Sequence, residues 1–249
     1  MPTFLLSIFI IVNLAKVAFF RLSELLKIPV VNHKKRWDDN LPEEVRWWEA
    51  FIRTGKDFED RLNPNLPLQA LIANLLPADQ RHVKILDVGA GPLTIVGKKF
   101  LDYDIDLTAV DPLANEYDKL VLKYQVNLPV KTRQAAAEQL TEVFAENTFD
   151  LAYARNCLDH SYNAEKAIVE MIKVTKPERY VLLEHQANEA EYQSYRGLHQ
   201  WNFSCWNNDF VIASPNGKIN FSRKHKEICT VSCTFYAADR WVITKIKKK

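Results

Sequence analysis

The sequence predicts an α/β fold built on a mostly parallel β-sheet. After residue 80, short apolar runs typical of strands alternate with segments of helical periodicity, as in a parallel sheet with crossover helices. Three of the six glycines, Gly89, Gly91 and Gly97, follow the first of these apolar runs. A second run, residues 107–111, ends on Asp111, about twenty residues further on. A glycine turn and an acid at two strand ends together predict a ligand site at the carboxyl edge of the sheet.

Length and composition predict one catalytic domain without a metal. The 249 residues, 47% of them hydrophobic, are enough to bury one α/β core with helical additions. The 33 basic side chains nearly balance 31 acidic ones, so a broad nucleic-acid footprint is not expected. The cysteines lack the paired C-x-x-C spacing of zinc sites, and we interpret them as reduced structural thiols. They are Cys157, Cys205, Cys229 and Cys233.

The first apolar run, residues 83–88, predicts a buried strand that leads into the glycine turn. Missing side chains at this turn let the backbone approach a ligand. Helical spacing follows, so a helix with exposed N–H groups is expected directly after the turn. The positions that carry this spacing are Leu93, Val96, Gly97, Phe100 and Leu101.

The acids at these strand ends indicate which ligand the turn holds. A dinucleotide fingerprint needs a third glycine where Thr94 stands, and Asp87 would repel a pyrophosphate. A carboxylate at that position attracts a cation instead. Asp111 is placed to accept hydrogen bonds from both hydroxyls of a ribose. A ribose and a cation together indicate S-adenosyl-L-methionine.

From about residue 40 to its end, the chain resembles the class I S-adenosylmethionine-dependent methyltransferases. Asp87, Gly89 and Gly91 match the E/D-x-G-x-G element of that family, and Asp111 matches the acid after its second strand. Further segments match the family in the same order. Residues 135–140 match its adenine segment, and residues 147–153 match its fourth strand. Residues 156–160 match its loop over the methyl donor, and residues 176–177 match the turn before its fifth strand. The order and spacing of these motifs make the resemblance specific.

The resemblance implies further cofactor-binding residues. These are Ala137 and Glu138 in the adenine segment and Asn156 in the loop over the donor. The chain departs from the family at Ala136, where an aspartate often contacts the adenine amino group, and at 178–179, where Glu and Arg replace glycines. The first departure leaves the adenine contacts open and does not affect the predicted fold.

The implied fold is a Rossmann-like, mostly parallel seven-stranded sheet with helices on both faces and an N-terminal helical extension. A helix is expected from residue 164, behind a cap at Asn163. The last strands, 229–236 and 241–246, are expected to form an antiparallel pair within a methyltransferase domain spanning 81–249. An insertion at about 187–225, which we expect to bind the acceptor, carries a hairpin of strands 210–214 and 218–222.

Residues 31–80 predict a separate helical cap region. Asn40 with Glu43 three residues later indicates a helix start, and Gly55 indicates its end. A break at 63–67 precedes a second helix at 68–76. The first helix carries Trp47, Trp48 and Phe51, which fit either ordinary packing against the sheet or a lid over the pocket.

The hydrophobic segment 1–30 predicts attachment to a membrane. Residues 2–20 contain one charge, Lys16, and would span about 28 Å as a helix. Both a spanning helix and an interfacial one fit, and a buried helix or a misassigned start codon is the alternative. Basic residues follow this segment, so we expect the domain on the cytoplasmic face, or in the cytoplasm if no anchor forms.

Candidate catalytic residues follow the fourth and fifth predicted strands, where the active cleft of such sheets lies. They are His160, His199, His185 and Glu184. Each histidine fits a structural hydrogen-bonding role as well as that of a general base, which is needed only for a hydroxyl or protonated-amine acceptor.

The sequence therefore predicts transfer of a methyl group from S-adenosylmethionine to a small-molecule, lipid-linked or glycan-type acceptor. The alternative is a non-catalytic S-adenosylmethionine-binding or scaffold protein with the same fold. Thr94 disfavours a third reading, an NAD-dependent oxidoreductase. The oligomeric state is left open.

Overall fold

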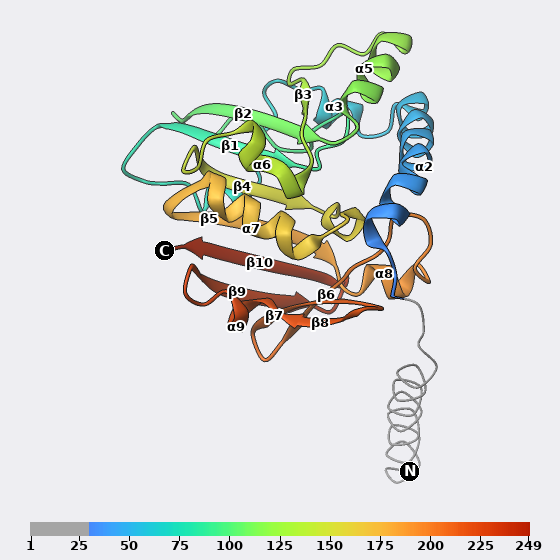
Figure 1. The fold of residues 1–249 in the computed structure, drawn as a ribbon. Helices are drawn as coiled ribbons and strands as arrows, with labels where there is room; N and C mark the ends of the chain where they lie inside the picture. The colour runs from blue at the N-terminus through green and yellow to red at the C-terminus, as the bar shows by residue number, and fades with distance from the viewer. Residues whose placement is uncertain (1–29) are drawn as a thin grey trace, which may run out of the picture. The chain divides into compact units, whose positions relative to one another are not determined.

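A seven-stranded sheet lies at the centre of the unit formed by residues 32–249 (Figure 1). The computed structural model describes residues 30–249. The strand order is β3-β2-β1-β4-β5-β10-β9; the first five are parallel, and β10 runs antiparallel to both neighbours. The strands are β1 His82–Val88, β2 Asp104–Asp111, β3 Thr132–Gln134, β4 Phe149–Arg155, β5 Thr175–Gln186, β9 Cys229–Tyr236 and β10 Trp241–Lys248. This topology confirms the predicted Rossmann-like, mostly parallel fold.

Helices cover both faces of the sheet. Leu86 and Val88 of β1 share one core cluster with Ile168 of α7 (Ala164–Val174), whereas Ile85 packs with Ile72 of α4 (Ala70–Ala73) on the other face. The alternation along β1 follows the two-residue period of a strand. Five further helical segments lie between residues 58 and 160: α3 Phe58–Arg61, α5 Ala114–Lys123, η1 Ala137–Gln139, α6 Leu140–Val143 and η2 Leu158–His160.

Several predicted elements match the structure closely. The side chain of Asn163 accepts a hydrogen bond from the Lys166 amide at 2.9 Å, which caps α7 as its sequence indicates. The predicted strands at 83–88, 229–236 and 241–246 correspond to β1, β9 and β10. Strong local signals, namely a cap residue or uninterrupted apolar alternation, coincide with each of these elements.

The helix predicted directly after the glycine turn is wrong. Residues 89–100 form an irregular segment that pairs with residues 66–68, through the bridge between Pro67 and Lys99 and the hydrogen bond from Leu68 N to Lys99 O at 2.7 Å. A Cβ atom on Gly97 would lie 2.1 Å from the carbonyl oxygen of Pro67, so this glycine serves a close backbone approach. The apolar spacing from Leu93 onward reflects burial of an extended segment, not a helix.

The first helix of the cap region begins eight residues earlier than Asn40 predicts. Helix α2 spans His33–Thr54, with Asn32 as its cap accepting from Lys35 N at 2.9 Å, and Pro42 lies inside it. The Asn40 side chain donates to Arg36 O within the helix. Gly55 ends the helix in the left-handed conformation, φ +64°, as predicted. Figure 1 shows α2 beside the edge of the sheet where the parallel strands end.

Between β5 and β9 lies a second, three-stranded sheet. It consists of β6 Asn202–Trp206, β7 Asp209–Ser214 and β8 Gly217–Asn220, flanked by α8 Glu189–Tyr192 and α9 Phe221–Lys224. The hairpin of β7 and β8 is the one that the sequence predicts. Phe203 and Phe210 are fully buried in the core cluster of the main sheet, so this small sheet is packed against it.

The hydrophobic segment at 1–30 lies outside the described residues, apart from Val30. Within residues 30–249, no helix has both the length and the apolar character that crossing a bilayer requires.

Candidate cofactor and acceptor site

A cavity of about 940 Å³ opens where β1, β2 and β4 end, between these strand ends and helix α2. Six of the seven predicted cofactor residues line it: Asp87, Gly89, Asp111, Ala137, Glu138 and Asn156. The predicted bases His160 and His199 line the same cavity. The carboxyl ends of parallel strands therefore bring the predicted donor motifs and His160 together, and the segment between α8 and β6 adds His199 to the same cavity.

The glycine turn fits closely against its neighbours. Gly89 and Gly91 have φ values of +70° and +61°, a conformation that side chains rarely adopt. A Cβ atom on Gly89 would lie 2.6 Å from the Cys157 side chain, and one on Gly91 would lie 2.2 Å from Trp48 of α2. Gly91, the one predicted cofactor residue that does not line the cavity, supports the turn beneath Trp48.

Asp111 is a buried carboxylate at the end of β2. Its Oδ2 accepts from Gly91 N at 3.1 Å and its Oδ1 from Leu113 N at 2.9 Å. Burial raises the pKa of Asp111 to about 7, and the two backbone donors only partly offset this effect. A carboxylate held this firmly at a cavity wall is suited to accept further hydrogen bonds from a ligand.

Asp87, at the end of β1, lies near the half-buried cation of Arg61. Burial raises the pKa of Asp87 to about 6, against the opposing hydrogen bond from Thr94 Oγ1 at 2.5 Å and the charge of Arg61. Arg61 donates from Nη1 to Leu93 O, but its buried Nε finds no acceptor within residues 30–249. Both side chains line the cavity. A carboxylate and an unsatisfied guanidinium therefore lie where a ligand with both charges fits.

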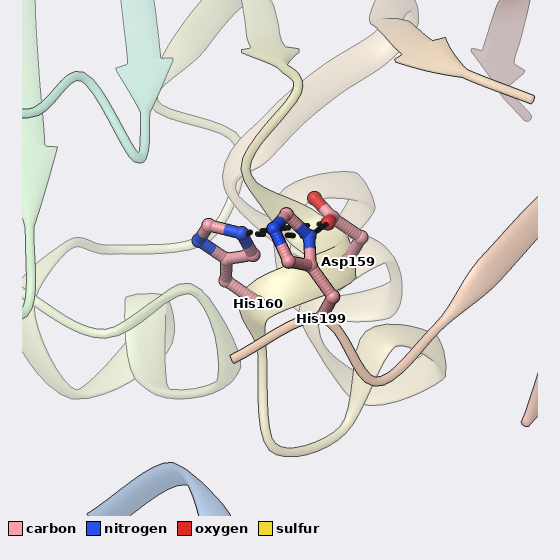
Figure 2. Close-up of side chains that lie close together, drawn as sticks. All are labelled: Asp159, His160 and His199. Atoms are coloured by element: carbon pink, nitrogen blue, oxygen red, sulfur yellow. Dashed lines mark hydrogen bonds and ion pairs between the residues drawn. The ribbon is translucent and has the colours of Figure 1, made fainter. Parts of the chain in front are cut away.

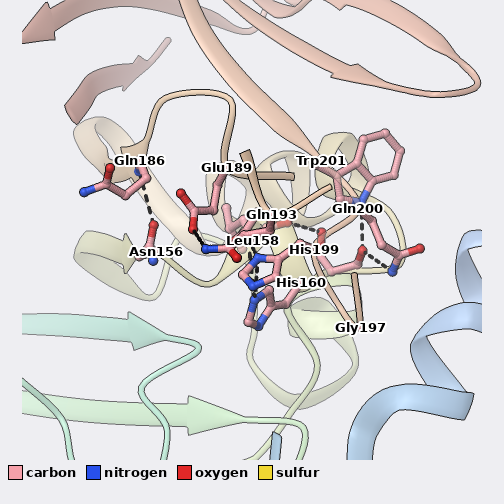
Figure 3. Close-up of polar contacts among 12 residues, drawn as sticks. Asn156, Leu158, His160, Gln186, Glu189, Gln193, Gly197, His199, Gln200 and Trp201 are labelled. Atoms are coloured by element: carbon pink, nitrogen blue, oxygen red, sulfur yellow. Dashed lines mark hydrogen bonds and ion pairs between the residues drawn. The ribbon is translucent and has the colours of Figure 1, made fainter. Parts of the chain in front are cut away.

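The other predicted cofactor residues also have partners within the protein. Glu138 accepts from Tyr162 N and Asn163 N at 2.7 and 3.0 Å, so its carboxylate holds the loop before α7. Asn156 adopts φ +47° and accepts from Gln186 N at 3.1 Å (Figure 3). Ala137 begins η1. These contacts fix the shape of the cavity wall at its predicted adenine and donor segments.

Three side chains converge where His160 and His199 line the cavity. Figure 2 shows Asp159 and the imidazoles of His160 and His199 turned toward one another. His199 Nδ1 lies 2.7 Å from Asp159 Oδ2 and 3.1 Å from His160 Nε2, and His160 Nε2 lies 3.5 Å from Asp159 Oδ2. Burial acts to lower the pKa of His199, but the hydrogen bond and charge of Asp159 outweigh it and raise that pKa. Asp159 is buried and is absent from our sequence-based candidates.

The two other predicted catalytic residues are not among the residues that line the cavity. His185 is 1% exposed and packs on Phe203 with a ring separation of 4.5 Å, and burial lowers its pKa to about 4. Glu184 accepts a hydrogen bond from Tyr153 at 2.8 Å. Among the predicted bases, the geometry therefore groups His160 with His199 and leaves His185 and Glu184 apart.

Comparison with known proteins identifies the domain around this cavity. Residues 86–183 match the family model described as a methyltransferase domain. This part of the chain is therefore similar to a methyltransferase domain. The matched residues run from β1 to the middle of β5 and include all seven predicted cofactor residues.

Solved structures with this fold are similar to the chain at low identity. The CurJ carbon methyltransferase is 16% identical with a TM-score of 0.51, over 70% of this chain and 50% of that chain. A proposed S-adenosyl-L-methionine-dependent methyltransferase from Methanococcus maripaludis is 11% identical with a TM-score of 0.50, over 83% of this chain and 93% of that chain. A Burkholderia thailandensis methyltransferase, crystallised with 1,6-didemethyltoxoflavin and S-adenosylhomocysteine, is 14% identical with a TM-score of 0.48, over 89% of this chain and 92% of that chain.

Two residues at or beside this cavity, Arg61 and Asp159, were not singled out by the sequence. Arg61 lies in the short helix α3, where one arginine among charged neighbours gives no sign of burial. Asp159 lies in the predicted loop 156–160, but the sequence gives no sign that His199, forty positions on, contacts it. Trp47, Trp48 and Phe51 of α2 line the cavity, as a lid would.

Proposed function

We propose that this protein transfers a methyl group from S-adenosyl-L-methionine to a polar acceptor of small-molecule, lipid-linked or glycan type. The observation that supports the proposal is the shared cavity, which is lined by Asp87 and Asp111 as well as by His160 and His199. The first pair matches the donor motifs of the family, whereas His160 is the last residue of the matched loop over the donor and His199 lies outside every matched segment. One space thus provides for a donor and an acceptor together.

The residues present fit the methyl donor. Asp111 would accept hydrogen bonds from the ribose hydroxyls, since its oxygens lie on the cavity wall at the end of β2. The charges of Asp87 and Arg61 suit the amino and carboxylate groups of the methionine part, and the free Nε of Arg61 supports this assignment. When bound, the sulfonium supplies an electrophilic methyl group. The protein's task is then to orient the acceptor and exclude water.

The acceptor side of the cavity favours a polar group. Trp37, Leu41 and Leu198 are apolar residues that line the same cavity as the imidazoles of His160 and His199. Such a wall with a few polar groups is typical of small-molecule sites. We propose that the cluster of Asp159, His160 and His199 activates a hydroxyl or amine of the acceptor for loss of its proton.

Two other functions make different predictions. A non-catalytic binding protein with this fold would bind the donor but transfer nothing, and Ala136 in the adenine segment is the feature that favours it. An oxidoreductase would prefer NAD, which the carboxylate of Asp87 beside the glycine turn disfavours.

We also propose that residues 2–20 attach the protein to a membrane, with the methyltransferase domain on the cytoplasmic face. The proposal rests on the apolar character of this segment, which contains a single charge, and on the basic residues that follow it.

Labelled methyl transfer tests the proposed function. The full-length protein, supplied with donor carrying a labelled methyl group and with small-molecule and lipid extracts, should label a compound in one of these extracts. His199→Ala should reduce this labelling by about 100-fold or more while donor affinity stays nearly constant, because acceptor activation matters only in the transition state. Donor binding without labelling of any extract would favour the non-catalytic alternative.

A further inference from the structure

We infer that Asp159, His160 and His199 form a binding site for a divalent transition-metal ion of the zinc type. One carboxylate oxygen and two imidazole nitrogens lie within 3.5 Å of one another, from loops about forty residues apart in the sequence. Three such atoms, each bound at about 2.1 Å to one ion, would be separated by about this distance. The inference departs from the sequence-based expectation of no metal.

Hydrogen bonding alone does not account for this convergence. If His199 Nδ1 carries a proton, it donates to Asp159 Oδ2 at 2.7 Å and offers nothing to His160 Nε2 at 3.1 Å. If the lone pair of His199 Nδ1 instead accepts a hydrogen bond from His160 Nε2–H, this nitrogen carries no proton to donate to Asp159 Oδ2. Either tautomer leaves one of the two short contacts unsatisfied. A cation between the three atoms satisfies all of them, because each then needs only a lone pair.

The surroundings of the three side chains also suit a cation. Asp159 is 1% exposed, and its second oxygen, Oδ1, is buried without a hydrogen-bond partner within residues 30–249. The imidazoles of His199 and His160 contact only the other oxygen, Oδ2, so Oδ1 retains lone pairs that a bound cation could use. Glu44 Oε2 lies 3.5 Å from Nδ1 of His160, the ring nitrogen that faces away from the cluster. A carboxylate on the far nitrogen of a ligating histidine fixes its tautomer and strengthens it as a ligand.

The fold holds the two contributing loops together. Gln200 N and Trp201 N both donate to the carbonyl oxygen of Asp159, at 2.9 and 3.3 Å. The indole of Trp201 donates to Ser161 O at 2.7 Å. His199 is therefore fixed beside Asp159 by contacts that do not involve its own ring. Preorganisation of this kind is what a metal site requires of its ligands.

The donor set indicates the class of ion and its role. Two imidazoles and one carboxylate favour zinc and its transition-metal neighbours over magnesium or calcium, which prefer oxygen ligands. Both histidines line the cavity, so a coordination position remains on the acceptor side. There the ion would bind an acceptor oxygen and lower its pKa. This role, unlike the site itself, rests on the proposed function.

Metal titration of the full-length protein tests the site. After treatment with a chelator, the protein should bind one equivalent of Zn²⁺ by calorimetry, and Co²⁺ should give the visible absorption of a low-symmetry nitrogen and oxygen site. Asp159→Asn and His199→Ala should each weaken Zn²⁺ binding by about 100-fold or more, and Glu44→Gln by about 10-fold. His82→Ala is the matched control, because His82 forms a similar 2.8 Å pair with Asp104 at the surface, without a third ligand among residues 30–249.

Several outcomes would overturn the inference. These are the absence of stoichiometric binding to the wild type, equal binding by the two ligand variants, and equal loss in His82→Ala. A sulfur-to-cobalt charge-transfer band would place the ion on cysteines and equally overturn it. Retained binding of the methyl donor shows that each variant is folded. Because donor binding and metal binding are measured separately, failure of the metal site is distinguishable from failure of the proposed function.

Discussion

At the scale of single residues, the site depends on carboxylates that the fold keeps away from water. Asp87 and Asp111 are 3% and 8% exposed, and burial raises the pKa of each. Burial of a carboxyl group penalises its ionised form, so these residues cost stability in order to be available to a ligand. Such a cost is common at functional sites.

The stability of the ligand-free protein should therefore depend on pH through Asp111. Between its unfolded pKa near 3.8 and its folded pKa of about 7, the folded state holds a proton that the unfolded state has released. The contribution of Asp111 to the free energy of unfolding is therefore fully present below this pH window. It is lost as the pH rises through the window, by up to a few kcal/mol. Denaturant unfolding of the wild type and of Asp111→Asn from pH 4 to 8 measures this effect. The free energy of unfolding of the variant, minus that of the wild type, should increase with pH.

The contribution of Asp150 to stability should depend on pH in the opposite direction, so this residue serves as a control. Burial acts to raise its pKa, but hydrogen bonds from Lys176, Lys84 and Gln80 outweigh this and lower it. Its contribution to stability is therefore present above the unfolded pKa and is lost as the pH falls. A pH-independent difference between wild type and Asp111→Asn would contradict the account of Asp111.

At the scale of elements, helix α2 and the glycine turn after β1 depend on each other. The ring of Trp48 occupies the space that a side chain on Gly91 would need. Neither feature is readable from the sequence alone, because the helix and the turn lie about forty residues apart. The contact places the aromatic face of α2 over the donor motif.

A double-mutant cycle measures this contact. Gly91→Ala should lower the free energy of unfolding by about 3 kcal/mol, of which about 1 reflects the left-handed backbone and about 2 the overlap with Trp48. In a Trp48→Ala background only the backbone part, about 1 kcal/mol, should remain. Equal costs in both backgrounds would show that Trp48 does not pack against the turn.

The sequence predicts elements well where the signal is local. β1, β9, β10 and α7 have caps or apolar alternation of their own, so their predicted bounds agree with the structure within a few residues. The helix predicted after the glycine turn fails because Gly97 serves contact with Pro67, which is thirty residues away. The same limit applies to the site. The donor carboxylates lie in short motifs, whereas the contact of Asp159 with His199 exists only in the folded chain.

At the scale of the whole molecule, the fold joins three parts of the chain around one cavity. Strand ends of the methyltransferase domain contribute Asp87 and Asp111, helix α2 contributes its aromatic side chains, and the segment after β5 contributes His199. Residues 1–30 take no part in this description. Membrane attachment and donor binding are therefore separable properties in our account.

Removal of residues 1–30 tests this separation. The shortened protein should leave the membrane fraction while binding the methyl donor as tightly as the full chain. Cell fractionation followed by immunoblotting gives the first result, and calorimetry gives the second. Full-length protein that remains in the soluble fraction would contradict the proposed anchor, whereas loss of donor binding on truncation would contradict the separation.

The central claim is that the cavity binds S-adenosylmethionine through Asp111, and calorimetric titration tests it most directly. The wild type should bind the methyl donor and show no comparable binding of NAD. Asp111→Ala should weaken donor binding by about 2 kcal/mol, or roughly 30-fold, because hydrogen bonds to a charged acceptor are lost. Unchanged affinity in Asp111→Ala, or tighter binding of NAD than of the donor, would contradict the account.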